Sequence, residues 1–122
     1  MWVESDQLLP SGESLARQFI YGQRYFASRF GAPCRVFWLP DSFGYNSAAP
    51  QLARLAGLDF FFTQKTSWSQ FNEFPNTSFR WQGQDKTQIA VHLCPQNTVR
   101  SLSILLWILS VIGAVERASE SS

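Results

Sequence analysis

One aspartate lies where a buried strand is expected to end. In VFWLPDSFGYNS, residues 36–47, an apolar run reaches Pro40, and Asp41 follows directly. The proline stiffens the backbone before the aspartate, and Gly44 permits a tight turn after it. A carboxylate held in this way can act as a nucleophile, a general base or a metal ligand. Aspartate also caps turns by bonding to nearby backbone, so the segment alone leaves both interpretations of Asp41 open.

A few other side chains could take part in chemistry. Lys65 could hold an anion or a hydroxyl group, or simply be solvated. Glu4 and Asp6 could divide acid and base work, although exposed loop acids are the commoner case. His92, the single histidine, has no Cys, Asp or Glu at ligand spacing, which is typical of a histidine satisfied within a sheet. Three tryptophans could stack on a sugar ring or fill the core: Trp38, Trp68 and Trp81.

Hydrophobic periodicity predicts the elements that must position Asp41 and Lys65. Apolar residues and one glycine recur in steps of three and four along residues 15–30, which predicts a helix capped by Ser11 and ended by Gly31. A second helix is predicted at residues 50–57, with Pro50 in its first turn. The predicted strands are residues 35–39, 58–64, 79–83 and 87–93, and Trp2 and Val3 resemble the end of another strand.

The order of these elements predicts the fold class and the place of the site. Alternation of strands and helices predicts an α/β fold with helices packed on a parallel sheet. In such sheets ligands bind at the carboxyl ends of the strands. Asp41 follows one predicted strand and Lys65 the next, so both belong to the expected functional edge.

Composition limits the function classes. The 122 residues suit one folded domain, and the net charge of +1 without a basic run argues against nucleic acid as a partner. Cys34 and Cys94 form no CxxC pair, which favours a reducing compartment, and we find no signal-peptide pattern. The uncharged stretch at residues 102–115 is shorter than the roughly 18 to 20 residues of a membrane-spanning helix, so a membrane span is not expected.

Two long segments carry a family resemblance: MWVESDQLLPSGESLARQFIYGQRYF at the start of the chain and FWLPDSFGYNSAAPQLARLAGLDFFFTQKTSWSQFNEFPNTSFRWQG after it. Both resemble the family 38 glycoside hydrolases, the α-mannosidases. The resemblance covers residues 1–92, and the wording LPDSFGY, FFTQK and FRWQG is nearest to the cytosolic branch. It therefore implies a cytoplasmic protein that acts on mannose-containing oligosaccharides, either free or as N-glycans.

The resemblance also implies roles for individual residues. Asp41 stands at the Asp of the family motif W-x-x-D-x-F-G. In the family this residue is the catalytic nucleophile of a retaining mechanism and a ligand of a divalent metal, usually zinc, with cobalt favoured in the cytosolic forms. Phe43 would line the sugar pocket, and Lys65 lies near a basic position that contacts substrate. Asp6, in the first motif, would be a supporting substrate-binding residue.

For the fold, the resemblance implies part of a seven-stranded parallel β/α barrel, with residues 1–92 as a partial catalytic domain and residues 93–122 as a divergent apolar and polar tail. The family's upstream His-x-Asp metal motif, its downstream ligand histidine and its general acid have no counterpart in residues 1–92. We therefore expect the isolated chain to be inactive. Two alternatives stay open: a non-catalytic truncated isoform that binds sugar or a partner weakly, and a small doubly wound α/β binding module.

Overall fold

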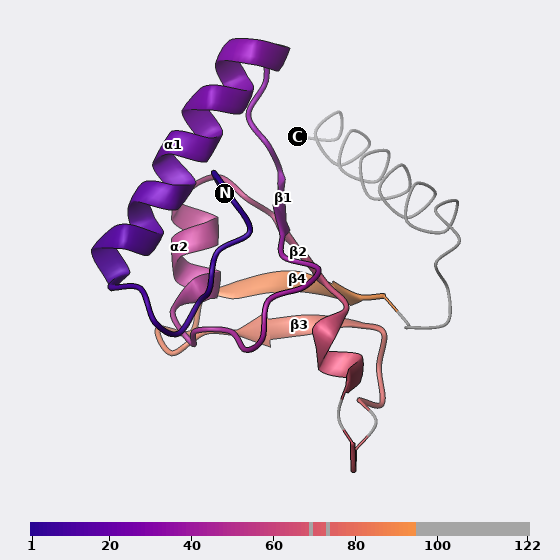
Figure 1. The fold of residues 1–122 in the computed structure, drawn as a ribbon. Helices are drawn as coiled ribbons and strands as arrows, with labels where there is room; N and C mark the ends of the chain where they lie inside the picture. The colour runs from indigo at the N-terminus through magenta and orange to yellow at the C-terminus, as the bar shows by residue number, and fades with distance from the viewer. Residues whose placement is uncertain (69, 73, 95–122) are drawn as a thin grey trace.

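In the computed structural model the described residues are 1–68, 70–72 and 74–94, and they form a four-stranded sheet with two helices on one face (Figure 1). The predicted tail from residue 95 onward, including residues 102–115, lies outside the described residues. In chain order the elements are α1 (Gly12–Phe30), β1 (Val36–Trp38), α2 (Ala49–Leu55), β2 (Phe60–Thr63), the 3-10 helix η1 (Lys65–Trp68), β3 (Ser78–Gln82) and β4 (Gln88–Leu93).

The long helix α1 begins and ends as its sequence predicts. The Ser11 hydroxyl accepts a hydrogen bond from the backbone N–H of Ser14, at 3.3 Å, and so caps the helix. Gly31 ends it with a left-handed φ of 77°, which glycine adopts without steric cost. Of the predicted apolar face, Leu15, Phe19 and Gly22 are buried.

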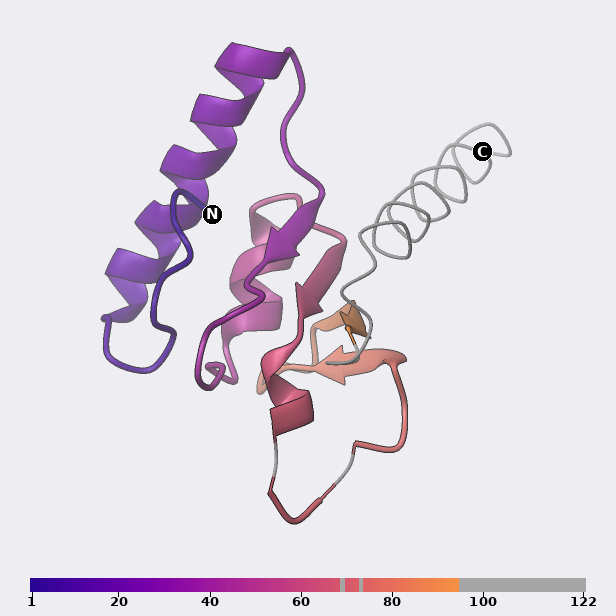
Figure 2. The same ribbon diagram turned by 45° about the vertical axis from the view of Figure 1, so that its right-hand side comes forward.

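The sheet is mixed, with strand order β1-β2-β4-β3. The prediction of a parallel sheet is confirmed for β1, β2 and β4 and is wrong for β3, which pairs antiparallel with β4. The reason is the short turn between β3 and β4, because a few residues can join two strands as an antiparallel hairpin but cannot make a parallel crossover. Figure 2 shows this hairpin with α2 and β1 between it and α1.

The prediction of a strand at Trp2 and Val3 is wrong. The N–H of Trp2 donates to the carbonyl of Gln18, at 2.9 Å, and the N–H of Val3 donates to the Gln18 side-chain oxygen, at 3.2 Å. Residues 1–3 therefore lie along α1 instead of pairing with a strand, and we call residues 1–9 the N-terminal arm. Gly22 permits this close approach, since a Cβ there would lie 2.4 Å from the Met1 carbonyl carbon.

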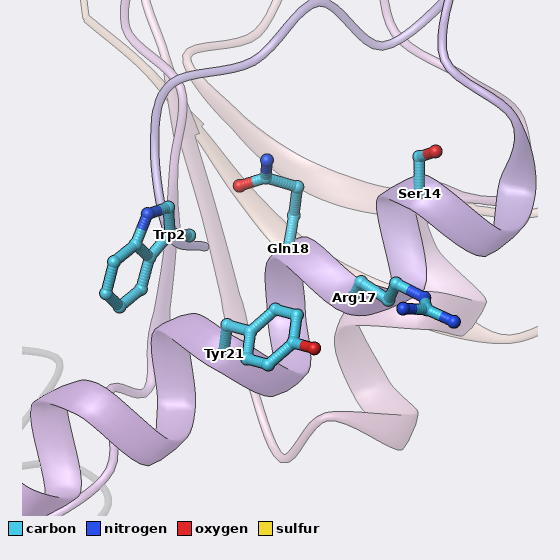
Figure 3. Close-up of a pocket in the computed structure, with 5 residues that line it drawn as sticks. All are labelled: Trp2, Ser14, Arg17, Gln18 and Tyr21. Carbon is cyan, nitrogen blue, oxygen red and sulfur yellow. The ribbon is translucent and has the colours of Figure 1, made fainter.

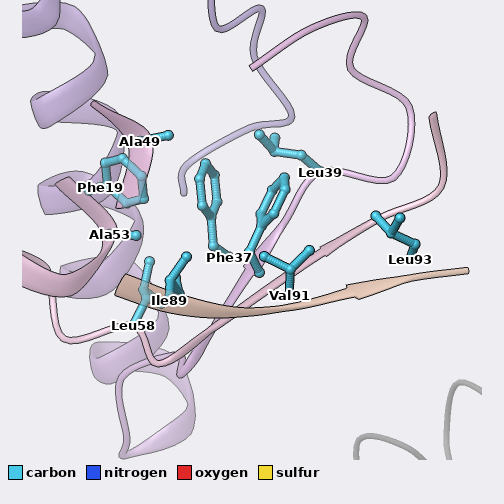
Figure 4. Packing of buried hydrophobic residues seen from close by; sticks show 10 residues of the cluster. Phe19, Phe37, Leu39, Ala49, Ala53, Leu58, Ile89, Val91 and Leu93 are labelled. Carbon is cyan, nitrogen blue, oxygen red and sulfur yellow. The ribbon is translucent and has the colours of Figure 1, made fainter. Parts of the chain in front are cut away.

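The core lies between the helices and the sheet (Figure 4). Phe19 of α1 meets Phe37 of β1 edge to face, with ring centroids 4.9 Å apart, and Phe37 meets Phe61 of β2 at the same separation. On the opposite face of the sheet, Trp38 stacks on Phe62 at 4.2 Å. These contacts hold β1 and β2 together on both faces.

The four-stranded sheet with its helices on one face can be compared with the two predicted architectures, the doubly wound module and the seven-stranded barrel. The described residues place α1 and α2 on the same face, whereas a doubly wound sheet carries helices on both. The seven-stranded barrel stays a prediction. No helix in the described part of the chain is long and apolar enough to cross a membrane.

Replacement of a core ring tests this packing. Phe61 is 2% exposed and contacts the rings of Phe37 and Trp81, so we expect Phe61→Ala to lower the free energy of unfolding by about 3–5 kcal/mol. Phe71→Ala is the matched control, because Phe71 is 86% exposed and its loss should change stability by less than about 0.5 kcal/mol. Urea unfolding measures both, and equal effects would contradict the described core.

Candidate active site

The register of β1 against β2 brings Asp41 and Lys65 to the same place. Each β1 residue pairs with the residue 24 positions later, as Val36 does with Phe60 and Trp38 with Phe62. The pairing continues past the strands, because the N–H of Gln64 donates to the carbonyl of Pro40 at 3.3 Å. The same offset pairs Asp41 with Lys65, at the carboxyl ends of the two parallel strands.

Asp41 and Lys65 form an ion pair at the surface. The Lys65 ammonium contacts Oδ1 of Asp41 and lies 4.6 Å from the centroid of the Phe43 ring. The Lys65 side chain is only 8% exposed, whereas that of Asp41 is 61% exposed. The ammonium therefore stands below the carboxylate and orients it, while Asp41 itself faces solvent. An aspartate buried in packed hydrocarbon would have excluded any role at a ligand site.

A pocket of about 270 Å³ opens around this pair. Its lining residues are Glu4, Asp6, Asp41, Ser42 and Phe43. Three of the four predicted site residues thus line one pocket, and the fourth, Lys65, contacts two of them. The pocket combines three carboxylates and one aromatic ring, a composition that suits a polar ligand with an apolar face, such as a sugar.

The N-terminal arm supplies one wall of the pocket. A carboxylate oxygen of Glu4 accepts a hydrogen bond from the backbone N–H of Asp41. The Ser42 hydroxyl donates to the carbonyl of Ser5, at 3.3 Å. The sequence offers no signal for these contacts, because the 37 positions between the partners give no periodicity that would place them together.

Asp6 is committed to the arm's own turn. Its Oδ1 accepts hydrogen bonds from the N–H groups of Leu8, at 2.7 Å, and Leu9, at 2.8 Å. Both bonds lower the pKa of Asp6, and the bond from Leu9 has the larger effect. The carboxylate of Asp6 is therefore ionised at neutral pH. The geometry is that of an aspartate that stabilises a turn, which fits a supporting residue.

Tyr45 and Thr63 lie behind the ion pair. The Tyr45 hydroxyl is hydrogen-bonded to Oγ1 of Thr63, and Thr63 is fully buried. Burial raises the pKa of Tyr45, the bond to Thr63 opposes that shift, and the charges of Glu4 and Asp41 add to it. The phenol therefore stays neutral at neutral pH and can donate or accept a hydrogen bond but does not add charge to the site.

The described residues do not fit a divalent metal by themselves. Within residues 1–94, apart from the two masked positions, no three His, Cys, Asp or Glu side chains converge as a metal site would need. Glu4 and Asp6 bond to backbone N–H groups, and the ammonium of Lys65 stands at one oxygen of Asp41. A catalytic zinc takes three protein ligands. Asp41 could supply one, so a complete site would need ligands from outside the described residues.

His92 and two of the three tryptophans lie in the sheet. Nδ1 of His92 is 2.8 Å from the Ser78 hydroxyl on the neighbouring strand, which confirms the prediction of a histidine satisfied within a sheet. Trp38 stacks on Phe62, and Trp81 packs against the core. The Trp68 side chain lies outside the described part of the structure.

A second pocket, of about 400 Å³, lies on the outer side of α1 (Figure 3). Trp2 of the arm and four residues of α1 line it: Ser14, Arg17, Gln18 and Tyr21. The guanidinium of Arg17 is bonded to Glu13, at 2.8 Å. This pocket shares no lining residue with the pocket at Asp41, and sequence reasoning missed it because Trp2 was assigned to a strand.

Comparison with known proteins decides the family. The profile of the glycosyl hydrolases family 38 N-terminal domain matches residues 1–110. The chain belongs to this family. The match extends beyond residue 92, the last residue of the motif resemblance, to residue 110.

Named relatives agree with the family assignment. The chain is 56% identical over 97 residues to an alpha-mannosidase of Saccharomyces cerevisiae, which covers 80% of this chain. It is 49% identical over 100 residues to alpha-mannosidase G of Dictyostelium discoideum and 48% identical over 94 residues to human alpha-mannosidase 2C1, covering 82% and 77% of the chain. The chain spans 9% of the length of each of these relatives.

The contact between the arm and the Asp41 loop can be tested at Gly44. Its φ of 100° strains any L side chain, and an added Cβ would lie 2.8 Å from Cδ1 of Leu8. We expect Gly44→Ala to cost about 1–3 kcal/mol of unfolding free energy, and less in a Leu8→Ala background, where the contact is relieved but the backbone strain remains. Gly12→Ala, with open space around it, is the control. A loss no larger than that of Gly12→Ala would contradict the strained φ at Gly44.

His92 predicts a pH dependence of stability. Burial lowers its pKa from the ordinary value of 6.5, so protons bind the unfolded chain more readily. The stability that neutral His92 contributes is complete above pH 6.5, declines as the pH falls below that value, and levels off below the folded-state pKa. Urea unfolding at about pH 7.5 and about pH 5.5 should show this decline, and His92→Gln should reduce it. Identical declines in both proteins would contradict the assignment.

Proposed function

We propose that this chain is the nucleophile-bearing part of a retaining α-mannosidase, with Asp41 as the nucleophile. The observation that supports this most directly is the exposed Asp41 carboxylate, oriented by Lys65 at the carboxyl ends of two parallel strands. It lines a pocket with Phe43, in a chain 56% identical to a yeast alpha-mannosidase. A merely structural aspartate in a turn would need neither the buried ammonium nor the open pocket.

The proposed reaction has two steps. A carboxylate oxygen of Asp41 attacks the anomeric carbon of mannose, the glycosidic bond breaks, and the leaving oxygen takes a proton from a general acid. In the second step the residue that served as general acid takes a proton from water. That water attacks the anomeric carbon and releases mannose from Asp41 with retained configuration. Lys65 would orient the nucleophile and contact sugar hydroxyls, and the exposed Phe43 ring would pack against the sugar. The general acid would come from outside the described residues.

Membership of the family supports a proposal for the substrate and for the cellular compartment. We propose terminal α-mannosides of free oligosaccharides or N-glycans as substrates, and a cytoplasmic protein. If a zinc or cobalt ion takes part, Asp41 would be one of its ligands and the other ligands would come from outside the described residues. No step of the reaction is assigned to the ion. The 122-residue chain alone should then bind sugar weakly and not turn it over, because Glu4 and Asp6 are already hydrogen-bonded to backbone groups.

A graft tests the role of Asp41. Residues 1–94 of this chain would replace the matching segment of the yeast alpha-mannosidase. We expect the graft to hydrolyse 4-nitrophenyl α-mannoside and Asp41→Asn to lower its kcat by at least about a thousandfold, because a nucleophile cannot be replaced by a neutral amide. A 2-deoxy-2-fluoro-mannosyl fluoride should label the peptide that contains Asp41, which mass spectrometry would detect.

Asp85→Asn is the matched control, since Asp85 lies in the turn between β3 and β4 and does not line the pocket. Turnover by the graft that survives Asp41→Asn, or a label on another residue, would refute the assignment. The isolated 122-residue chain should show no turnover. Hydrolysis by that chain, lost in Asp41→Asn, would show that it carries a complete site.

A further inference from the structure

The arm touches the Asp41 loop at three successive positions. Glu4 bonds to the N–H of Asp41, the carbonyl of Ser5 accepts from Ser42, and Leu8 packs on Gly44. The arm is itself fixed to α1 through Trp2, whose N–H donates to Gln18. Rigid helix α1 is therefore connected to the loop through the arm, and the loop does not depend on its own turn alone.

Glu4 makes the one contact in this set that reaches Asp41 directly. Its carboxylate accepts from the main-chain N–H of Asp41, while Lys65 holds the side chain of the same residue. A charged acceptor makes a stronger hydrogen bond than a neutral one. Glu4 also lines the pocket, so its carboxylate lies beside the place where a ligand would contact Asp41.

We propose that Glu4 is a positioning residue that fixes the backbone of Asp41 and so sets the line along which its carboxylate meets the substrate. The proposal rests on the proposed function of Asp41 as nucleophile. Attack requires the reacting atoms to lie about 3–3.5 Å apart and aligned, and a displacement near 1 Å can cost about a hundredfold in rate. Pro40 stiffens the backbone before Asp41, but Gly44, three residues after Asp41 and with a φ of 100°, adds no stiffness on the other side.

Charge also argues for a specific role. The three carboxylates of this small pocket repel one another, and the turn of the Asp41 loop does not require an acid at position 4 of the arm. Here the Asp41 N–H and the Lys65 ammonium offset that repulsion from two sides. A residue that served only to pack the arm against the loop would be apolar, as Leu8 is.

Three variants separate positioning from packing. Glu4→Ala removes the acceptor, Glu4→Gln keeps an amide oxygen in its place, and Glu13→Ala removes an exposed acid of α1 that pairs with Arg17 and lies outside the pocket. Two measurements apply to each: hydrogen exchange and the proton shift of the Asp41 amide in the 122-residue chain, and kcat and KM of the graft on 4-nitrophenyl α-mannoside.

We expect Glu4→Ala to move the Asp41 amide signal and speed its exchange at least about tenfold, because the N–H loses its acceptor. In the graft, kcat should fall by about tenfold to a hundredfold with KM changed by less than about twofold. Glu4→Gln should recover most of both effects, and Glu13→Ala should match the parent chain. Because glutamine restores both the volume and an acceptor, the Asp41 amide is the readout that separates the two roles: if Glu4 only packed the arm against the loop, Glu4→Ala would leave that amide's shift and exchange unchanged.

Two results would overturn the proposal. One is an unchanged Asp41 amide in Glu4→Ala. The other is a raised KM at unchanged kcat, which would make Glu4 a substrate contact instead of a positioning residue. Failure of the proposed function is distinguished by Asp41→Asn: if that graft keeps its turnover, Asp41 is not the nucleophile, while the amide exchange still reports whether Glu4 fixes the loop.

Discussion

The parallel pairing of β1 with β2 is the constraint on which the site depends. The offset of 24 residues between paired positions fixes which residue of the second loop meets Asp41, and it places Lys65 there. A register shifted by one residue would turn every side chain of β1 to the other face, so the core and the site are set together. Phe37 and Phe61 secure the register from the helix side, and Trp38 and Phe62 secure it from the other.

Local signals predicted most of the fold. The cap at Ser11, the stop at Gly31 and the short apolar runs of the strands are features of neighbouring residues, and they appear where the sequence places them. The predicted strand at Trp2 and Val3 is wrong because two neighbouring apolar residues have the same sequence pattern whether they join a sheet or lie against a helix. Only Gly22, many residues later, lets the backbone of Met1 approach α1, and that contact leaves no periodic pattern.

The sequence predicts which residues form the site, but it does not predict the contacts between them. Asp41 and Lys65 could be assigned to one edge because parallel strands end there, and family motifs singled out Phe43 and Asp6. The bond from Glu4 to the Asp41 backbone could not be foreseen, since it joins two loops and follows no spacing rule. Asp6, the acid that the motif favoured, stabilises its own turn, whereas Glu4 contacts Asp41. Asp6 and Glu4 are both acids, so the geometry of the arm's turn, and not the residue type, decides which of them contacts Asp41.

Lys65 and Glu4 constrain different parts of the same residue. Lys65 acts on the side-chain carboxylate from a nearly buried position, where water screens its charge less than at the surface. Glu4 acts on the main chain from an exposed position, where water competes, so its hold on the loop depends on the arm remaining docked on α1. Orientation of the carboxylate and location of the loop are thus separable properties.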